Sequence, residues 1–416
     1  MLASHVIREA RRAGIGAETI SAVGGIRRFV PEVDEVSLLA VAPAAEHMRL
    51  LRAFARLPVI TDVSNETPCS ITASTERGAL TLHVAAPEHA GSALLWHTGS
   101  RAHVEQLQRR AERAGLRLTQ GRIAHMDGTV VACPTEEDLY TRLGLPYIPP
   151  ELREGDGEIE AAERGELPLL VSELHIRGDL HMHSTWSDGR NSIADMVSAS
   201  KQLGYEYIAI TDHSERAGSS RALAAADVPN QRQEVDTVRA RTRGIDVLHG
   251  IEVDIMLDGS LDFDDTLLEG FDLVLASLHD SGGQNATQLA ERYLRALRHP
   301  LVNVITHPVN RAPGRSNGYP LDFDRLFAVA ADTGTAMEID GAAGHLDLDG
   351  AMARRAVAAG VTLVVDSDSH RMDALGRQMR FGVGTARRGW IEPQHVLNTR
   401  PVDDVRAFVA RKRARG

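Results

Sequence analysis

The chain from about residue 177 onward alternates short apolar runs with amphipathic stretches. The apolar runs are rich in β-branched residues and predict strands at 176–183, 205–213, 244–255, 271–280, 301–308, 334–340 and 361–370. Between them, helical spacing of apolar residues, often ended by glycine, predicts helices at 191–204, 286–300, 323–334 and 348–360. Such alternation indicates an α/β fold, with a parallel sheet covered by helices that is either open or closed into a barrel.

The first 150 residues show a more mixed pattern. A short helical stretch precedes residues 24–42, and strand-like runs follow at 58–63, 69–74 and 79–86. A basic helical stretch covers 100–118. The next segment, 145–176, is rich in Pro, Gly and acidic residues, and we place a linker in it, over 151–176. The sequence therefore predicts an α+β region joined to an α/β region.

Composition narrows the class of protein. The 416 residues carry a net charge of −11, which argues against general electrostatic attraction to nucleic acid, although a local basic face remains open. We find no apolar run long enough for a membrane span and no signal-peptide core at the start. Cys69 and Cys133 lie far apart without metal-type spacing, which favours a reducing compartment. We expect a cytoplasmic enzyme or binding protein without a membrane partner.

Metal-capable side chains stand at or just after the ends of nearly every predicted strand. They are His181, His183, His213, Glu252, His279, His307, Asp368 and His370. A single histidine at a strand end is more often structural. Successive ones would converge on one face, because the carboxyl ends of barrel strands point the same way. Uncompensated polar groups gathered there would be costly, so the pattern predicts a metal site with more than one ion.

The ligand types indicate the chemistry. Imidazole suits Zn, Mn and Fe, bridging carboxylates suit paired divalent ions, and the absence of cysteine disfavours a structural zinc site. The ligands are too many for one ion, so we expect two or three. Clustered divalent ions bind phosphate oxygens and ionise water near neutral pH. These residues therefore predict a metal-dependent phosphoester hydrolase.

Residues 177–416 also resemble a PHP domain (polymerase and histidinol phosphatase), of the type found at the C-terminus of bacterial family X DNA polymerases. The resemblance lies in "RGDLHMHSTWSDGRNSI", "YIAITDHS", "LHGIEVDIMLDGSLDF" and "MRFGVGTARRGWIEPQHVLNT". It implies a distorted seven-stranded (β/α) barrel with a three-ion cluster. It also implies an activity similar to a Mn-dependent 3′–5′ exonuclease of DNA repair, which processes other 3′ ends and abasic sites as well.

The resemblance implies a role for each ligand position. One ion would be held by the catalytic set His181, His183, Glu252 and Asp368. Glu252 would bridge to a second ion on His279 and His307, and a third would lie on Asp188, His213 and His370. Asp188 stands in "SDG", which is also an ordinary turn sequence.

Three other polar residues near these motifs have expected roles. Asp212 and Asp254 are expected to orient ligands or cap turns. Arg311 is a further catalytic candidate that could hold a substrate phosphate as a bidentate donor, or it could be an ordinary loop arginine.

One segment departs from the family pattern. Where family members have "EINANPxRLDL", this chain has "EIDGAAGHLDL", so that Asp340, Ala342 and His345 replace Asn, Asn and Arg. These positions would flank the mouth of the pocket. The departure therefore concerns substrate choice rather than metal binding.

The N-terminal half resembles the palm (about 1–90) and thumb (about 91–150) of the same polymerases, through "GGIRRFVPEVDEVSLLAV", "HTGSRAH" and "GLPYIPPELREGDGEIEAA". Nucleotidyl transfer needs three carboxylates that hold two Mg ions. The corresponding positions are Glu35, Ser37 and Thr81, and Gly25 replaces the serine of the triphosphate loop. The family's lyase, hairpin and fingers regions are not found. We expect that polymerase activity is lost.

The basic stretch 101–117 offers a route to nucleic acid. It holds Arg101, His103, Arg109, Arg110, Arg113 and Arg117. These could track DNA phosphates by charge, or form a solvated face balanced by Glu105 and Glu112. The leading hypothesis is a phosphoesterase acting on DNA 3′ ends. The alternatives are a small-molecule phosphomonoesterase of the histidinol-phosphatase type and a non-catalytic DNA-end binding protein.

Overall fold

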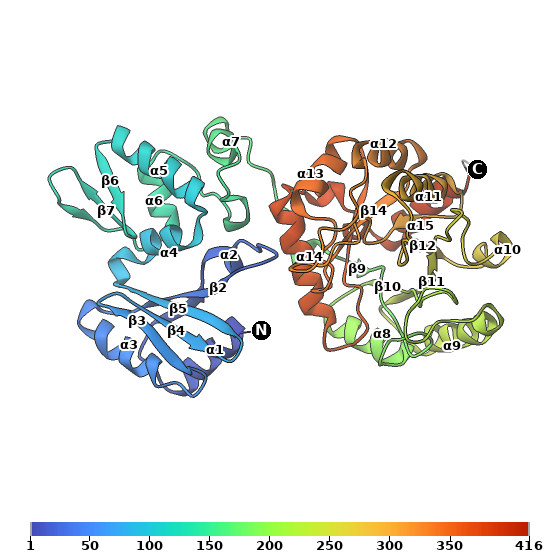
Figure 1. The fold of residues 1–416 in the computed structure, drawn as a ribbon, viewed down its shortest axis with the longest axis horizontal. Helices are drawn as coiled ribbons and strands as arrows, with labels where there is room; N and C mark the ends of the chain where they lie inside the picture. The colour runs from blue at the N-terminus through green and yellow to red at the C-terminus, as the bar shows by residue number, and fades with distance from the viewer. Residues whose placement is uncertain (1, 415–416) are drawn as a thin grey trace. The chain divides into compact units, whose positions relative to one another are not determined.

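The computed structural model describes residues 2–414, and the chain divides into two compact units, 1–167 and 168–416 (Figure 1). Within residues 2–414, no sheet is shared between the units, and each unit has its own hydrophobic core. Among the described residues, no helix is both long and apolar enough to cross a membrane.

The C-terminal unit is built on a seven-stranded parallel sheet whose strands are ordered as they occur in the chain. They are β9 (Gly178–Asp179), β10 (Tyr207–Ile210), β11 (Asp246–Asp254), β12 (Leu273–Ser277), β13 (Val304–Ile305), β14 (Ala336–Asp340) and β15 (Leu363–Asp366). A parallel bridge between Met182 and Ser369 joins the two edges beyond β9 and β15. The sheet is therefore nearly closed as a barrel, which confirms what the resemblance implied and decides between the open and closed sheets that the apolar pattern allowed.

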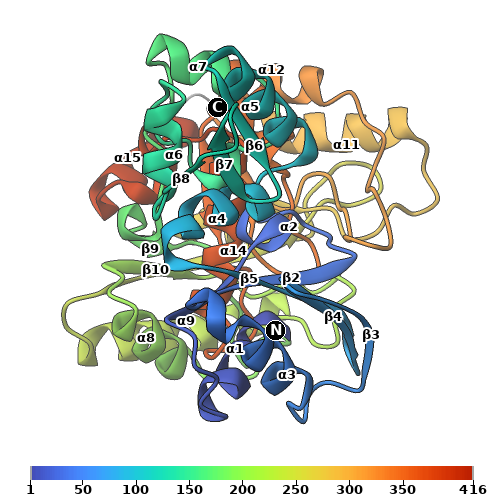
Figure 2. The same cartoon turned by 90° about the vertical axis from the view of Figure 1, so that its left-hand side faces the viewer.

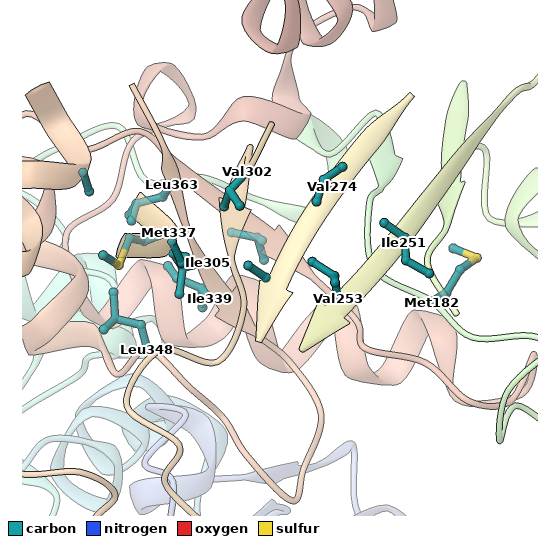
Figure 3. Packing of buried hydrophobic residues seen from close by; sticks show 14 of the residues in the cluster. Met182, Ile251, Val253, Val274, Val302, Ile305, Met337, Ile339, Leu348 and Leu363 are labelled. Carbon is teal, nitrogen blue, oxygen red and sulfur yellow. The ribbon is translucent and has the colours of Figure 1, made fainter. Parts of the chain in front are cut away.

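Helices cover the outside of this sheet (Figure 1): α8 (Ile193–Gln202), α9 (Val228–Arg241), α10 (Asp265–Leu268), α11 (Ala286–Arg298), α12 (Phe323–Thr333), α13 (Gly350–Ala358) and α14 (Leu375–Arg388). Several begin where the sequence supplies a cap. Ser192 and Asn285, for example, form capping boxes at the starts of α8 and α11. Alternate strand residues pack under these helices, including Ile251, Val253 and Val274 (Figure 3).

The other strand residues form a second cluster, which includes Leu248, Leu275 and Val304 and is closed by α15 (Val402–Arg413) through Val405. Side chains in a strand alternate between faces with a period of two. The alternation that buries Leu248 in this cluster therefore carries Glu252 to the same face at the carboxyl end of β11. Apolar packing thus fixes the direction of the polar side chains beyond it.

The N-terminal unit contains a five-stranded sheet in the order β1-β2-β5-β4-β3. The strands are β1 (Thr19–Ala22), β2 (Glu35–Val41), β3 (Asp62–Thr67), β4 (Ser70–Thr75) and β5 (Gly78–Ala85). Helices α1 (Leu2–Arg12) and α3 (His47–Ala55) pack on one face (Figure 2), while α2 (Gly24–Arg27) and α4 (Ala90–Thr98) contact β2. The strand predicted at 58–63 is displaced to β3, because that edge strand is exposed and polar and shows no apolar period.

The rest of this unit holds α5 (Arg101–Arg113), a three-stranded sheet of β6 (Leu116–Thr119), β7 (Arg122–His125) and β8 (Val130–Val131), and helices α6 (Glu136–Arg142) and α7 (Glu158–Arg164). The stretch expected as a linker is divided between the units. Residues 151–167 belong to the first, where buried Arg153 pairs with Glu136. Residues 168–176 belong to the second, where Val171 N–H donates to Ile391 O at 2.8 Å.

Candidate metal centre

The nine predicted ligands lie together at the carboxyl end of the barrel. They come from the segments after β9, β10, β12, β13 and β15 and from β11 itself: His181, His183, Asp188, His213, Glu252, His279, His307, Asp368 and His370. Most are buried. The least covered side chains are His370, His279 and Asp188, at 34%, 25% and 20% exposure. These three mark the open side of the cluster, from which a substrate would reach it.

The first group consists of His181, His183 and Asp368, each with a ligand atom within 4.8 Å of the others. The two Nε2 atoms lie 3.2 Å apart, and His183 Nε2 lies 3.1 Å from Asp368 Oδ1. Glu252 Oε2 lies 3.4 Å from His181 Nε2. Asp368 has a positive φ of 47°, a strained conformation of the kind that gathers at functional sites.

Glu252 is the centre of the arrangement. Its fully buried carboxylate lies 2.7 Å from His213 Nδ1, 3.0 Å from His307 Nε2 and 3.5 Å from His279 Nε2. Burial alone would raise the pKa of Glu252, but His213, His181 and His279 outweigh it and hold that pKa well below its usual range. Glu252 is therefore ionised and placed to bridge ions.

A third group contains Asp188, His213 and His370, which the resemblance assigns to one ion, together with His183. His370 Nε2 lies 3.1 Å from Asp188 Oδ1, and His213 Nε2 lies 3.6 Å from the same oxygen. His213 also forms a group with Glu252 and His279. The geometry thus leaves His213 between two groups, and the assignment of individual ligands to ions stays a prediction.

The residues fit divalent cations. Glu252 Oε2 and His213 Nδ1 are buried and close, yet neither has hydrogen-bond geometry to any described residue. Burial, reinforced by His213 and His370, lowers the pKa of His183 to about 3, so its ring is neutral and can ligate. Buried polar atoms left without partners are costly, and a shared cation would satisfy them. Bound divalent ions would supply Lewis-acid chemistry and a water ionised near neutral pH.

A second layer of carboxylates orients these ligands. Glu338 Oε1 accepts from His181 Nδ1 at 2.6 Å, and Glu338 Oε2 accepts from His307 N–H at 2.8 Å. Asp254 Oδ1 lies 2.9 Å from His279 Nδ1, which turns the ring's Nε2 toward Glu252. The sequence predicted such a role for Asp254, as an alternative to capping a turn, but not for Glu338, although Glu338 occurs in a strand-end "EID" much as Glu252 occurs in "IEVD".

Two other expected residues have structural contacts. Asp212 accepts from the backbone N–H groups of Ser184 and Ser187 at 2.7 and 3.2 Å, so it fixes the turn after His183. Arg311 donates to Asp349 at 3.2 Å and to His345 O at 3.3 Å. These contacts tie Arg311 to the segment after β14, and its role in binding phosphate stays a prediction.

The polymerase-like positions also come together, in the N-terminal unit. Ser37 and Thr81 are register partners on the parallel strands β2 and β5, and Glu35 lies two residues before Ser37. Ser37 Oγ donates to Glu35 Oε1 at 3.3 Å, and Thr81 Oγ1 donates to Glu35 Oε2 at 3.2 Å. The three side chains therefore meet, but they bring one carboxylate and two hydroxyls.

The basic stretch 101–117 is only partly available for binding. His103 does not belong to an exposed basic face, because it is buried and bonded to Glu158 and Tyr140 at 2.6 and 2.9 Å. Arg110 donates to Leu143 O and pairs with Glu163, and Arg101 pairs with Glu105 at 2.7 Å. The exposed arginines Arg109, Arg113 and Arg117 remain as candidates.

Known protein families match a stretch in each half of the chain. Residues 93–154 match the DNA polymerase beta thumb family, and residues 179–308 match the PHP domain family. Over 397 residues the chain is 36% identical to the Bacillus subtilis protein named DNA polymerase/3′-5′ exonuclease PolX, covering 94% of this chain and 68% of that protein. The chain belongs to the PolX family.

Other relatives of this PolX-family chain share a shorter stretch. A Shewanella oneidensis protein named Probable phosphatase is 32% identical over 211 residues, 48% of this chain and 78% of the relative. A Thermoanaerobacter pseudethanolicus protein of similar name is 26% identical over 247 residues, 56% of this chain and 95% of the relative. The PHP domain, with these relatives, makes the chain a phosphoester hydrolase. PHP domains are metal-dependent, and the histidine and carboxylate groups described above can hold metal ions.

Proposed function

We propose that this protein hydrolyses phosphodiester bonds at the 3′ ends of DNA, in the service of DNA repair, and that its palm-like part no longer transfers nucleotides. The observation that carries the proposal is the union of a full ligand cluster at the barrel end with a thumb-like region in one chain. The Bacillus subtilis relative that spans both parts bears an exonuclease name.

The loss of nucleotidyl transfer is argued from the palm site. Two catalytic Mg ions need several carboxylate oxygens, whereas Glu35 is the single carboxylate at the three corresponding positions. Both of its oxygens already accept hydrogen bonds from hydroxyls. A two-ion site would lack most of its ligands there.

Contact with DNA is argued from the thumb-like region. Arg109 and Arg113 are exposed and lie four residues apart on α5, hence on one face of the helix. Arginines in this arrangement bind phosphates without reading sequence. The overall charge of −11 is unfavourable for binding DNA, so this local face would have to supply the attraction.

A small phosphomonoester is the second candidate substrate. Two observations favour it: relatives named as phosphatases match the barrel half, and the segment 338–348 departs from the pattern of family X polymerases. The non-catalytic DNA-end binding protein is disfavoured, because a structural metal site needs only one closed set of ligands.

The test is a direct competition between substrates. Purified protein with Mn²⁺ is offered 3′-labelled single-stranded DNA and histidinol phosphate, and both products are followed. We expect shortening of the DNA from its 3′ end. Intact DNA with cleaved monoester would overturn the proposal in favour of the phosphomonoesterase, and no hydrolysis of either would favour the binding protein.

Two variants assign the activity to its parts. His307→Ala removes a ligand 3.0 Å from Glu252 and should abolish hydrolysis of either substrate. Arg109→Glu with Arg113→Glu should lower kcat/KM on DNA by about tenfold and reduce its salt dependence, while leaving monoester hydrolysis unchanged. An unchanged rate on DNA would remove the thumb-like region from the proposal.

A further inference from the structure

Two polar side chains beside the metal centre lie outside the nine predicted ligands. Asp340 is the last residue of β14, and His345 lies in the turn that follows. Both stand at positions where the sequence departs from the pattern of family X polymerases. The function of the nine-ligand cluster does not account for either residue.

Asp340 is fully buried and only half satisfied. Its Oδ1 accepts the N–H of Ala342 at 2.6 Å, whereas Oδ2 has no hydrogen-bond partner within residues 2–414. His345 Nδ1 is also buried and unpartnered there. Buried polar atoms of this kind require an explanation, and a bound ion is one of the few available.

These two residues face a ligand of the cluster. Asp340, His345 and Asp368 each offer one atom within 4.8 Å of the other two. The strand pairing explains why, because Asp340 is the register partner of Asp366 on β15, two residues before Asp368. The His345 ring lies 5.2 Å from the ring of His307, so the group adjoins the cluster on that side.

We propose that Asp340, His345 and Asp368 form an additional divalent-cation position, with Asp368 shared between it and the His181–His183 group. The inference rests on the proposed metal-dependent function and extends the same site. Two carboxylates and one imidazole are ligands for Mn or Zn, and a water or a substrate oxygen would complete the shell.

A cation explains the geometry better than a proton does. Asp340 and Asp368 are buried carboxylates with oxygens within 4.8 Å of each other, and a cation between them would offset their mutual repulsion. A protonated Asp340 would need an acceptor at hydrogen-bond distance from Oδ2, and the described residues supply none. Two ligands about 2.1 Å from one ion lie roughly 3 to 4 Å apart, and the three atoms of this group lie within 4.8 Å of one another.

The backbone around Asp340 is held firmly in place. A Cβ on the next residue, Gly341, would lie 2.0 Å from Gln378 O on α14, so the chain passes α14 too closely for any residue other than glycine. The Asp340 N–H donates to Asp347 O on the other side of the turn. The site is therefore built on fixed backbone, as metal sites require.

The experiment counts bound Mn²⁺ in the full-length protein. Wild type, Asp340→Asn, His345→Gln and the exposed control Asp373→Asn are equilibrated with the same free Mn²⁺, desalted and measured by elemental analysis, with circular dichroism as a check of folding. We expect Asp340→Asn and His345→Gln each to hold one equivalent fewer than wild type and Asp373→Asn. The nine-ligand cluster should remain loaded in all four.

The outcomes separate this inference from the proposed function. Equal stoichiometry in the four proteins would overturn the additional position and leave the hydrolase standing. A loss of two or more equivalents in a folded Asp340→Asn variant would also overturn it, because Asp340 would then belong to the main cluster. Wild type without bound Mn²⁺ would instead reject the metal-dependent function itself.

Discussion

The barrel end and the palm-like site offer a comparison within one chain. Each gathers polar side chains from neighbouring strands, and in each the strand register determines which residues meet. In the barrel, buried imidazoles and carboxylates approach one another without satisfying their hydrogen-bonding capacity. In the palm, the hydroxyls of Ser37 and Thr81 each donate one hydrogen bond to Glu35.

The difference indicates how a site that binds cations can be told from one that does not. Several carboxylates close together repel one another and need a positive charge between them. A single carboxylate has no such neighbour, and neutral hydrogen-bond donors can satisfy it. The palm-like site has a single carboxylate, so hydroxyl donors are enough for it. In the barrel site, Glu252 lies close to His213, His279 and His307, and a bound cation would join these side chains.

The largest effect is expected from Glu252→Gln. An amide cannot bridge two cations, and it leaves several buried histidines without their shared charge. We expect a loss of at least about 1,000-fold in kcat together with bound metal, since ligand and charge are removed at once. Hydrolysis of 3′-labelled DNA and elemental analysis of the same sample check this. Normal metal content with normal kcat would mean that Glu252 is not the bridge.

A smaller effect is expected from Glu338→Gln, which keeps the ligands but loosens His181. The Glu338 carboxylate accepts from His181 Nδ1 and from the backbone N–H of His307. Outer partners of this kind typically contribute about 10- to 100-fold in metal affinity or activity. Metal titration should show weaker binding, and excess Mn²⁺ should restore much of kcat. A loss that excess Mn²⁺ fails to restore would contradict a positioning role.

These residues also show how far the sequence reaches. The apolar runs predicted every strand of the barrel, and reading each run to its end located the cluster. The role of Glu338 was not predicted, because its partner His181 is 157 residues away in the sequence. The two residues come together only when the β9 and β15 edges of the sheet close. The predicted position of the edge strand β3 was wrong, because an exposed polar strand shows no apolar periodicity.

The same limit applies to His103 and Arg110. Their spacing on α5 suggested an exposed basic face, but helical spacing does not reveal which side of a helix is covered by later segments. His103 is covered by α7 and α6 through Glu158 and Tyr140. Tertiary contacts of this kind are not encoded in local periodicity.

A more modest effect is expected on the pH dependence of stability in the N-terminal unit. His83 on β5 and His97 on α4 stack with ring centroids 3.7 Å apart, and burial together with His83 lowers the pKa of His97 to about 3. The unfolded chain takes up a proton near pH 6.5 that the folded chain resists. The neutral ring therefore leaves the folded state at its full stability above pH 6.5. That stability decreases as the pH falls from 6.5 toward 3, because only the unfolded chain takes up the proton.

We expect this group to destabilise the unit by roughly 1 kcal/mol between pH 6.5 and pH 5, after allowance for solvent screening. His97→Phe removes the titration and should flatten the dependence. Hydrogen exchange of amides in α4 and β5, compared between wild type and variant at each pH, measures it. A pH dependence that is the same in both proteins would assign the effect to other groups.

The smallest effect should come from Glu35→Gln, the counterpart of Glu252→Gln in the palm-like site. Because Glu35 is exposed and already accepts hydrogen bonds from two hydroxyls, an amide of the same shape can replace it with little cost. We expect unchanged hydrolysis of DNA, unchanged metal content and no nucleotide incorporation in either protein. Any fall in hydrolysis, or any incorporation by wild type that the variant loses, would mean that the palm-like site still binds a cation. The two sites would then differ in how tightly they bind a cation, and not in whether they bind one.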